Sequence, residues 1–80
     1  MKALDVLKRG NMVLLYCGGD DISADFQCEK IRIMEQIFNV IKVGVYNSIG
    51  DVKAALIQID AKEDQSIPLG DILVIKWMID

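Results

Sequence analysis

The amino-acid sequence predicts a small α+β domain, and three patterns lead to that prediction. Residues 12–17 and 71–79 are apolar runs of strand length, and residues 22–28 alternate between apolar and polar side chains as a half-buried strand does. Residues 29–43 instead space their polar side chains three to four apart, as an amphipathic helix does. We expect one antiparallel or mixed sheet packed against this main helix, in a single globular domain of residues 1–80.

The first expected elements are a short helix and a β-hairpin. Residues 2–9 are predicted to be helical, because Gly10 and Asn11 follow directly and tolerate the left-handed conformation that ends a helix. Residues 12–17, MVLLYC, are typical of a buried strand, and residues 22–28 are its expected hairpin partner. The four residues GGDD between them are a common length for a hairpin connection.

The segment 29–43 is the expected main helix, lying across the sheet. One helical face would carry polar residues, and the opposite face would carry apolar residues that pack on the strands. The polar set is Arg32, Glu35, Gln36, Asn39 and Lys42, and the apolar set is Ile31, Met34, Phe38 and Ile41, widened by Ile33 and Ile37. The many β-branched residues argue against a helix, but burial in the tertiary structure often overrides such a preference.

The last third of the chain is expected to add strands. Residues 51–61 fit a helix or a strand, and alternation across residues 53–60 favours the strand. Residues 71–79, DILVIKWMI, are apolar on both sides, which predicts the central strand of the sheet with Trp77 in the core. If Trp77 instead faces solvent, it would form a protein interface with Ile75 and Ile79, because tryptophan is frequent at binding hot spots.

The stretch YCGGDD, residues 16–21, is the sharpest functional motif. It resembles the signature hairpin of palm-type nucleotidyl cyclases, such as the GGDEF diguanylate cyclases and the large subunit of type III CRISPR effectors. That resemblance implies glycines that approach a triphosphate and acids, here Asp20 and Asp21, that hold Mg²⁺. The family's further metal-binding acid lies on an earlier strand, whereas Asp5 is the sole acid before Gly18. We therefore expect a turn, no cofactor and no enzymatic activity, with a divalent metal at Asp20 and Asp21 as the alternative.

Cysteine and histidine usage bounds the chemistry and the compartment. The chain has no histidine and only two cysteines, Cys17 and Cys28, so a zinc site within one chain is not expected. Because they lie far apart on the arms of the predicted hairpin, the two thiols are expected to be free, which fits a reducing compartment. No apolar run approaches the length of about 20 residues that spans a bilayer. The expected location is the cytoplasm, of a cell or of an infected host.

Charge and hydropathy favour protein partners over nucleic acid. The net charge is −3 and the basic residues do not cluster in the sequence, whereas nucleic-acid binding depends on neutralising phosphates. Hydrophobic residues make up 52% of a chain that is too short to bury them all. Self-association, as a homodimer or a larger assembly, or binding to another protein is therefore expected.

The expected function is that of a small non-enzymatic protein-interaction or self-assembling module, such as a regulatory or accessory protein of a virus or mobile element. One alternative is a ligand-binding domain that uses the GGDD tip for a divalent metal or a phosphorylated small molecule. A third is a nucleic-acid-binding regulator that gathers Lys8, Arg9, Lys30 and Arg32 on one face only as an oligomer.

Overall fold

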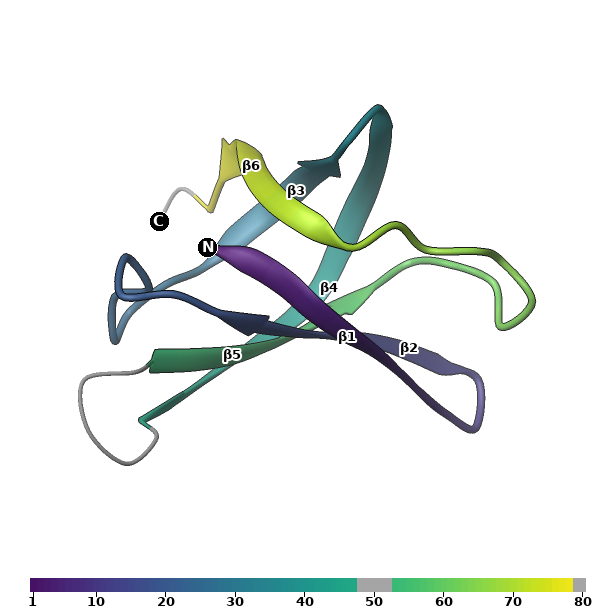
Figure 1. The fold of residues 1–80 in the computed structure, drawn as a ribbon, viewed down its shortest axis with the longest axis horizontal. Helices are drawn as coiled ribbons and strands as arrows, with labels where there is room; N and C mark the ends of the chain where they lie inside the picture. The colour runs from purple at the N-terminus through teal and green to yellow at the C-terminus, as the bar shows by residue number, and fades with distance from the viewer. Residues whose placement is uncertain (48–52, 79–80) are drawn as a thin grey trace.

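The computed structural model of the protein is a closed antiparallel β-barrel, and it describes residues 1–47 and 53–78 (Figure 1). Around the barrel the strands follow the order β1-β2-β5-β4-β3-β6, and every neighbouring pair is antiparallel. The described residues contain no helix, so the expected α+β class is wrong. The strands are β1 (Lys2–Arg9), β2 (Met12–Gly18), β3 (Cys28–Ile33), β4 (Gln36–Asn47), β5 (Lys53–Ile59) and β6 (Gly70–Trp77).

The main helix predicted at residues 29–43 is instead the hairpin of β3 and β4. Ile33 pairs with Gln36, so Met34 and Glu35 form a two-residue turn between the strands. Neither residue is the Gly, Asn or Asp that usually marks such a turn. The chain reversal therefore cannot be recognised from the sequence. The β-branched residues that argued against a helix are typical of strands, where they pack across the sheet.

The helix predicted at residues 2–9 is strand β1. Arg9 pairs with Met12, so Gly10 and Asn11 reverse the chain between β1 and β2 instead of ending a helix. Gly10 has φ +61°, a left-handed conformation that glycine adopts without steric cost. Helix propensity over so short a segment is weak, and pairing with β2 outweighs it.

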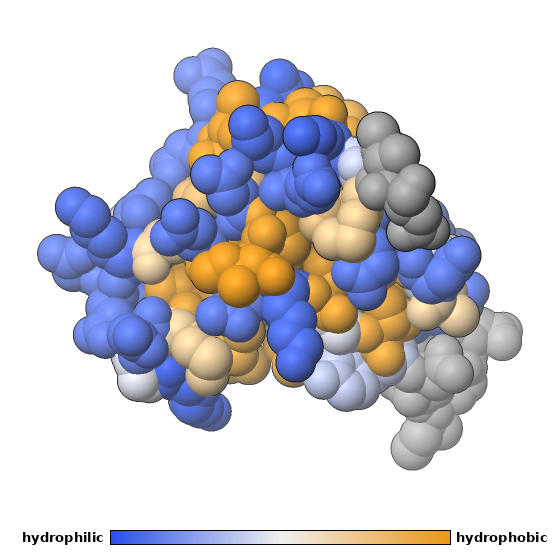
Figure 2. All heavy atoms as spheres, turned by 180° about the vertical axis from the view of Figure 1, so that it is seen from behind, coloured by the Kyte–Doolittle hydropathy of each residue, from blue (hydrophilic) through white to orange (hydrophobic). Residues whose placement is uncertain are grey.

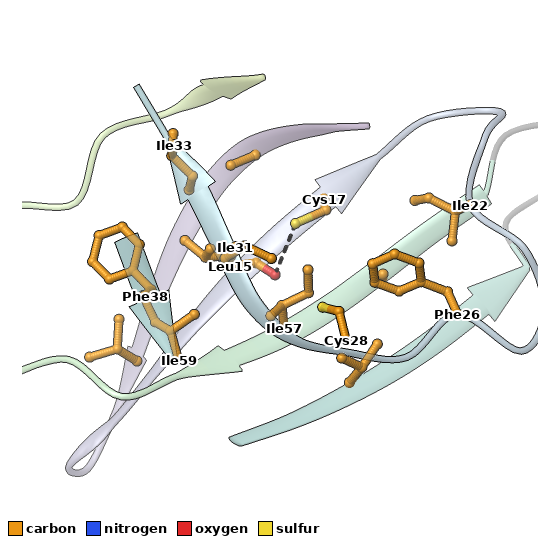
Figure 3. Close-up of a cluster of buried hydrophobic side chains, with 14 residues drawn as sticks. Leu15, Cys17, Ile22, Phe26, Cys28, Ile31, Ile33, Phe38, Ile57 and Ile59 are labelled. Carbon is orange, nitrogen blue, oxygen red and sulfur yellow. Dashed lines mark hydrogen bonds between the residues drawn. The ribbon is translucent and has the colours of Figure 1, made fainter. Parts of the chain in front are cut away.

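The hairpin predicted for residues 12–17 and 22–28 is also wrong. Strand β2 pairs with β1 and β5, and the chain that follows it is a loop up to Cys28, the first residue of β3. The alternation in ISADFQC reflects burial rather than strand pairing, because Ile22 and Phe26 of this loop are buried at one end of the barrel (Figure 3). A period of two can therefore arise in a loop that covers a barrel end.

The two C-terminal strands lie close to their predicted positions, but β6 is not the central strand that the sequence predicted. Strand β5 covers residues 53–59 of the strand predicted at residues 53–60, and it pairs with β2 and β4. Strand β6 covers most of the strand predicted at residues 71–79, of which residue 79 lies outside the described part of the chain. Strand β6 is not central, since none of its side chains is buried. An apolar run on both faces indicates a central strand only when both faces are covered.

The barrel interior is filled by apolar side chains from β1 to β5 and from the loop before β3. Figure 3 shows them converging, with Ile22 and Phe26 toward one end and Phe38 toward the other. No polar or charged residue is buried in the described ranges. The buried cluster comprises Ala3, Val13, Leu15, Cys17, Ile22, Phe26, Cys28, Ile31, Ile33, Phe38, Val43, Ala55, Ile57 and Ile59.

Cys17 and Cys28 are free thiols within this core, which confirms the sequence prediction. The predicted hairpin that separated them does not exist, and they lie instead on β2 and at the start of β3. Burial, with a smaller effect of Cys28, raises the pKa of Cys17 to about 12, and burial raises the pKa of Cys28 to about 11. Both thiols are therefore protonated near neutral pH, and a protonated thiol is a poor nucleophile.

Replacing Met34 by glycine should stabilise the barrel. Met34 has φ 55° at the first position of its turn, the position that Gly10 occupies with φ +61° in the turn between β1 and β2. A left-handed conformation costs an L-residue about 1–2 kcal/mol, whereas glycine costs about 0.5–1 kcal/mol in lost chain entropy. We expect Met34→Gly to raise the free energy of unfolding by up to about 1 kcal/mol in urea titrations.

Glu35→Gly is the matched control, because Glu35 lies in the same turn without a positive φ. We expect it to lower the free energy of unfolding by about 0.5–1 kcal/mol, the entropic cost of glycine. If both substitutions destabilise the protein equally, Met34 does not adopt this turn conformation.

Candidate functional site

The GGDD tip fastens the N-terminus to the barrel. The Met1 ammonium donates a hydrogen bond to Asp21 Oδ2 at 2.8 Å, and the Gly19 N–H donates to the Lys53 carbonyl at 3.2 Å. A Cβ on Gly19 would lie 2.5 Å from Asp21 Oδ1 and 3.0 Å from Met1 Cα. Only glycine leaves room for this approach, so the glycine of the tip has a structural role.

The pKa of Asp21 is consistent with its ion pair to the N-terminus. The hydrogen bond from the N-terminal ammonium lowers the pKa of Asp21, so the carboxylate stays charged in mildly acidic solution. The described residues include no group of three or more His, Cys, Asp or Glu side chains that could hold a metal ion. One of the two predicted metal ligands is thus engaged by a cation of the chain itself, and a metal at Asp20 and Asp21 stays a prediction.

Strand β6 closes the barrel against β1 over a short seam. Only Gly70 and Asp71 of β6 pair with β1, and the Ile72 N–H donates to the Met1 carbonyl at 3.1 Å. Beyond Ile72, β6 pairs only with β3 in the described part of the chain (Figure 1). The other edge of residues 73–77 therefore has no strand beside it within residues 1–47 and 53–78.

The backbone of Val74 points to this open edge. In an antiparallel strand, the N–H and C=O groups of alternate residues point to the same side. The Ile72 N–H points to β1, so Val74, two residues further on, presents its N–H and C=O to that side and away from β3. An open edge of this kind is a template for a further strand.

Large apolar side chains of β6 are exposed to solvent. Leu73 is 51% exposed, Ile75 42% and Trp77 56%. The expectation that Trp77 lies in the core is therefore wrong, because more than half of its surface is exposed to solvent. Of the predicted interface residues, Trp77 and Ile75 lie at the surface, and Ile79 lies outside the described residues.

An apolar row crosses β6, β3 and β4 on the outside of the barrel. Leu73 pairs with Arg32, and Arg32 pairs with Ile37 on its other side. Residues directly opposite each other point to the same face of a sheet, and Ile37 is 59% exposed on this face. Arg32 between them can cover apolar surface with its methylene stem and keep its charge in water.

The Trp77 ring lies beyond this row and does not continue it. Trp77 pairs with the buried Cys28 after an irregularity in the register of β3 and β6, and its ring contacts the core residue Phe26. Its centroid lies 5.7 Å from that of Phe26, with the two rings at 80° in an edge-to-face arrangement. Beside it is an open hollow of about 340 Å³ lined by Ser23, Asp25, Phe26, Gln27, Trp77 and Met78. The contact with Phe26 therefore orients the Trp77 ring, while more than half of the residue's surface stays exposed to solvent.

A second hollow lies on the outer face of β2, β5 and β4. Its volume of about 220 Å³ is below the range of about 300–1,000 Å³ that is typical of small-molecule sites. Tyr46 lies across Gly44, since a Cβ at that position would come within 3.1 Å of the Tyr46 hydroxyl. Figure 2 shows apolar side chains gathered in the middle of the rear face of the barrel, with hydrophilic side chains around them. The lining residues are Leu14, Lys42, Gly44, Tyr46, Leu56 and Gln58.

The basic residues of the nucleic-acid alternative are divided between two strands. Lys8 and Arg9 end β1, whereas Lys30 and Arg32 lie on β3, and β6 stands between these strands around the barrel. The Lys8 Nζ donates to the Glu63 carbonyl of the loop before β6. Within one copy the four side chains therefore do not form a single basic strip.

The sequence pattern did not indicate Leu73 and Ile37 as surface residues. A uniform apolar run does not tell which of its residues face outward, and Ile37 stood in a predicted helix. One signal was present, since Asp71 and Lys76 flank the apolar run 72–75. Charges at the ends of a strand are typical of sheet edges, where they limit uncontrolled pairing.

Comparison with protein-family models, with curated proteins and with solved structures gives no match. A proposal of function for this chain therefore rests on the geometry of the barrel and its surface. Among the described residues, no helix is long and apolar enough to cross a membrane.

Asp21→Asn should weaken the fastening of the N-terminus by a small, pH-dependent amount. Asp21 is 61% exposed, so we expect its ion pair to contribute about 0.2–1 kcal/mol to the free energy of unfolding at neutral pH. Because folding lowers the pKa of Asp21, this contribution is present above its ordinary value of 3.8 and is lost as the pH falls through the lowered value. Urea titrations at pH 7 and at about pH 2 should show the wild type and the variant converging in acid.

Asp20→Asn is the control, because Asp20 takes no part in this ion pair. We expect its free energy of unfolding to stay within about 0.5 kcal/mol of the wild type. A melting temperature that rises with millimolar Mg²⁺ in the wild type, and in neither variant, would show that the tip is a metal site instead.

Proposed function

We propose that this chain is a non-enzymatic protein-interaction module that binds a protein partner through β6. The observation that carries the proposal is that β6 buries none of its own side chains, although it is largely apolar. We call the exposed residues of this region the β6 surface, meaning Leu73, Ile75 and Trp77 together with Arg32 and Ile37 across the neighbouring strands. Large exposed apolar patches on a small protein mark interaction sites more often than chance.

The barrel does not need the β6 surface for its own core. Every member of the buried cluster comes from β1 to β5 or from the loop before β3, and only Ile72 and Val74 of β6 pack partly against it. Fully burying a large apolar side chain stabilises a protein or a complex by about 1.5–3 kcal/mol. The outward side chains of β6 do not gain this stabilisation within one copy, and a partner would supply it.

Trp77 has the properties of a binding anchor. Its edge-to-face contact with Phe26 restricts the ring before any partner arrives, so less side-chain entropy is lost on binding. The ring is still 56% exposed and can enter a pocket of the partner. Tryptophan is among the residues that most often dominate the energy of a protein interface.

Charged groups around the β6 surface would give it selectivity. Lys76 Nζ lies 3.0 Å from Glu29 Oε2 at the end of β6, and both side chains are exposed to solvent. Arg32 lies within the apolar row itself. A polar rim of this kind adds little affinity but disfavours partners whose charges do not match.

Replacing β6 surface residues by serine should weaken association while leaving the barrel folded. Trp77→Ser and Leu73→Ser each remove an exposed side chain whose burial in a complex is worth about 1.4 kcal/mol or more, so the dissociation constant should rise at least tenfold. Sedimentation equilibrium would measure self-association, and affinity capture with the wild type as bait would measure binding to other proteins. Far-UV circular dichroism would confirm that each variant keeps its strands.

Met12→Ser is the matched control, because Met12 is 41% exposed at the start of β2, away from β6. It should change the dissociation constant by less than about threefold, as a substitution outside an interface does. If Met12→Ser weakens association as much as Trp77→Ser does, or if the β6 substitutions have no effect on any association, the β6 surface is not the binding site.

A further inference from the structure

We infer that the partner bound through β6 places an arginine side chain in the hollow between Trp77 and the loop before β3. This inference rests on the proposed function, and it adds the chemistry of the group that the partner presents. The hollow has a volume of about 340 Å³, which lies within the range of about 300–1,000 Å³ that is typical of small-molecule sites. Its lining consists of Ser23, Asp25, Phe26, Gln27, Trp77 and Met78.

The indole ring of Trp77 forms an aromatic wall of this hollow. Trp77 is 56% exposed, and its ring meets that of Phe26 at 80° with the centroids 5.7 Å apart. In an edge-to-face pair each ring covers at most one face of the other, so Phe26 leaves at least one face of the indole uncovered. The face of an indole ring is electrostatically negative and attracts a cation placed over it. The wall therefore favours a cationic occupant.

Asp25 is the one charged residue in the lining of the hollow. The ion pairs found among the described residues do not include Asp25, so its carboxylate is available to a cation from outside. Lys76, the residue before Trp77, is paired with Glu29 at 3.0 Å and does not take this place. The net charge of −3 also attracts cations to the protein as a whole. Charge complementarity thus selects a basic group of the partner.

The loop holds Asp25 in place before a partner binds. The Phe26 N–H donates to the Ser23 carbonyl at 3.1 Å, which closes a turn over residues 23–26 with Asp25 at its third position. Ile22, before the turn, and Phe26, at its end, are both buried, and Figure 3 shows their side chains at one end of the core. A carboxylate on a turn anchored at both ends loses less chain entropy when it binds a partner.

Arginine is the side chain whose chemistry matches both walls of the hollow. Its planar guanidinium stacks on an aromatic face, and its paired N–H groups bind a carboxylate through two hydrogen bonds. Lysine carries a compact, strongly hydrated ammonium that lacks this planar geometry. Asp25 would repel an acidic side chain, and an apolar side chain would cover the carboxylate without pairing it, which costs free energy.

Titration with capped amino acids tests the hollow before the partner is known. The probes are N-acetyl-arginine amide, the corresponding lysine amide, and the citrulline amide, which keeps the length and planar end of arginine without its charge. Trp77 is the one tryptophan of the chain, so its fluorescence and the NMR shift of its indole N–H report binding. We expect saturable binding of the arginine probe at millimolar concentration, and binding of the other two probes that is at least about fivefold weaker.

Two substitutions in the hollow test the walls separately. Asp25→Asn should weaken binding of the arginine probe at least about tenfold, because charge-assisted hydrogen bonds are lost. Asp20→Asn is the matched control, since it removes the same charge from the same loop outside the lining of the hollow, and it should change binding by less than about twofold. Trp77→Leu stays apolar without an aromatic face and should weaken binding at least about fivefold, measured by NMR. Melting curves would show that each variant is folded, and if Trp77→Leu is not, the comparison of Asp25→Asn with Asp20→Asn decides.

The outcomes separate this inference from the proposed function. Equal binding of the arginine and citrulline probes, or equal weakening by Asp25→Asn and Asp20→Asn, overturns the inference. If no arginine binds while Trp77→Ser and Leu73→Ser still weaken association with a captured partner, the inference fails and the proposed function stands. If the arginine probe binds as expected but no substitution on β6 weakens any association, the proposed function fails, and with it the assignment of the arginine to a partner bound through β6.

Discussion

The short seam between β1 and β6 is the constraint on which the rest of this structure depends. A barrel removes its sheet edges only when the last strand pairs with the first along its length. Here the pairing ends at Gly70 and Asp71, with one further hydrogen bond from Ile72 to the Met1 carbonyl. Closure therefore holds one end of β6 and leaves the other end as an edge, which is where the apolar side chains without internal partners lie.

The fastening of the N-terminus follows from the same constraint. Met1 takes part in this seam, because its carbonyl accepts the hydrogen bond from the Ile72 N–H. Asp21 holds the Met1 ammonium, and Gly19 leaves the space that lets the two approach. The tip that looked like a metal or phosphate motif thus has a structural task, which is to fix the beginning of β1. Gly19 and Asp21 thus support the fold beside the short seam between β1 and β6.

Burial was easier to predict from this sequence than the elements that produce it. Phe38 was expected on the buried face of a helix and is buried on strand β4 instead. Its burial was predicted correctly because both the helical and the strand periodicity place its side chain on the inner face. The burial of Ile37 and Ile41 was predicted wrongly. The predicted helix placed both side chains on its buried face, whereas strand β4 points them to the outside of the barrel. The error has one origin, the turn at Met34 and Glu35, whose residues carry no turn signal although Met34 has φ 55°.

The role of β6 could not be read from its composition. DILVIKWMI fits a strand covered on both faces and equally a strand that a partner covers, because the residue types required are the same. What separates the two is how far the folded barrel covers β6, and that coverage depends on the arrangement of all six strands. The sequence offered Trp77 and Ile75 as interface residues only as an alternative, and the structure places both at the surface, whereas the exposure of Leu73 and Ile37 and the edge itself required the barrel.

Amide hydrogen exchange of β6 at low and high protein concentration is the most direct measurement of the central claim. The Leu73 N–H points to β3 and should be protected at every concentration, whereas the Val74 N–H should exchange rapidly in dilute solution. At concentrations where the protein associates, the Val74 N–H should become protected while Leu73 changes little. A Val74 N–H that is already protected in dilute solution would contradict an open edge of β6, and a β6 whose exchange does not change on association would contradict binding through β6.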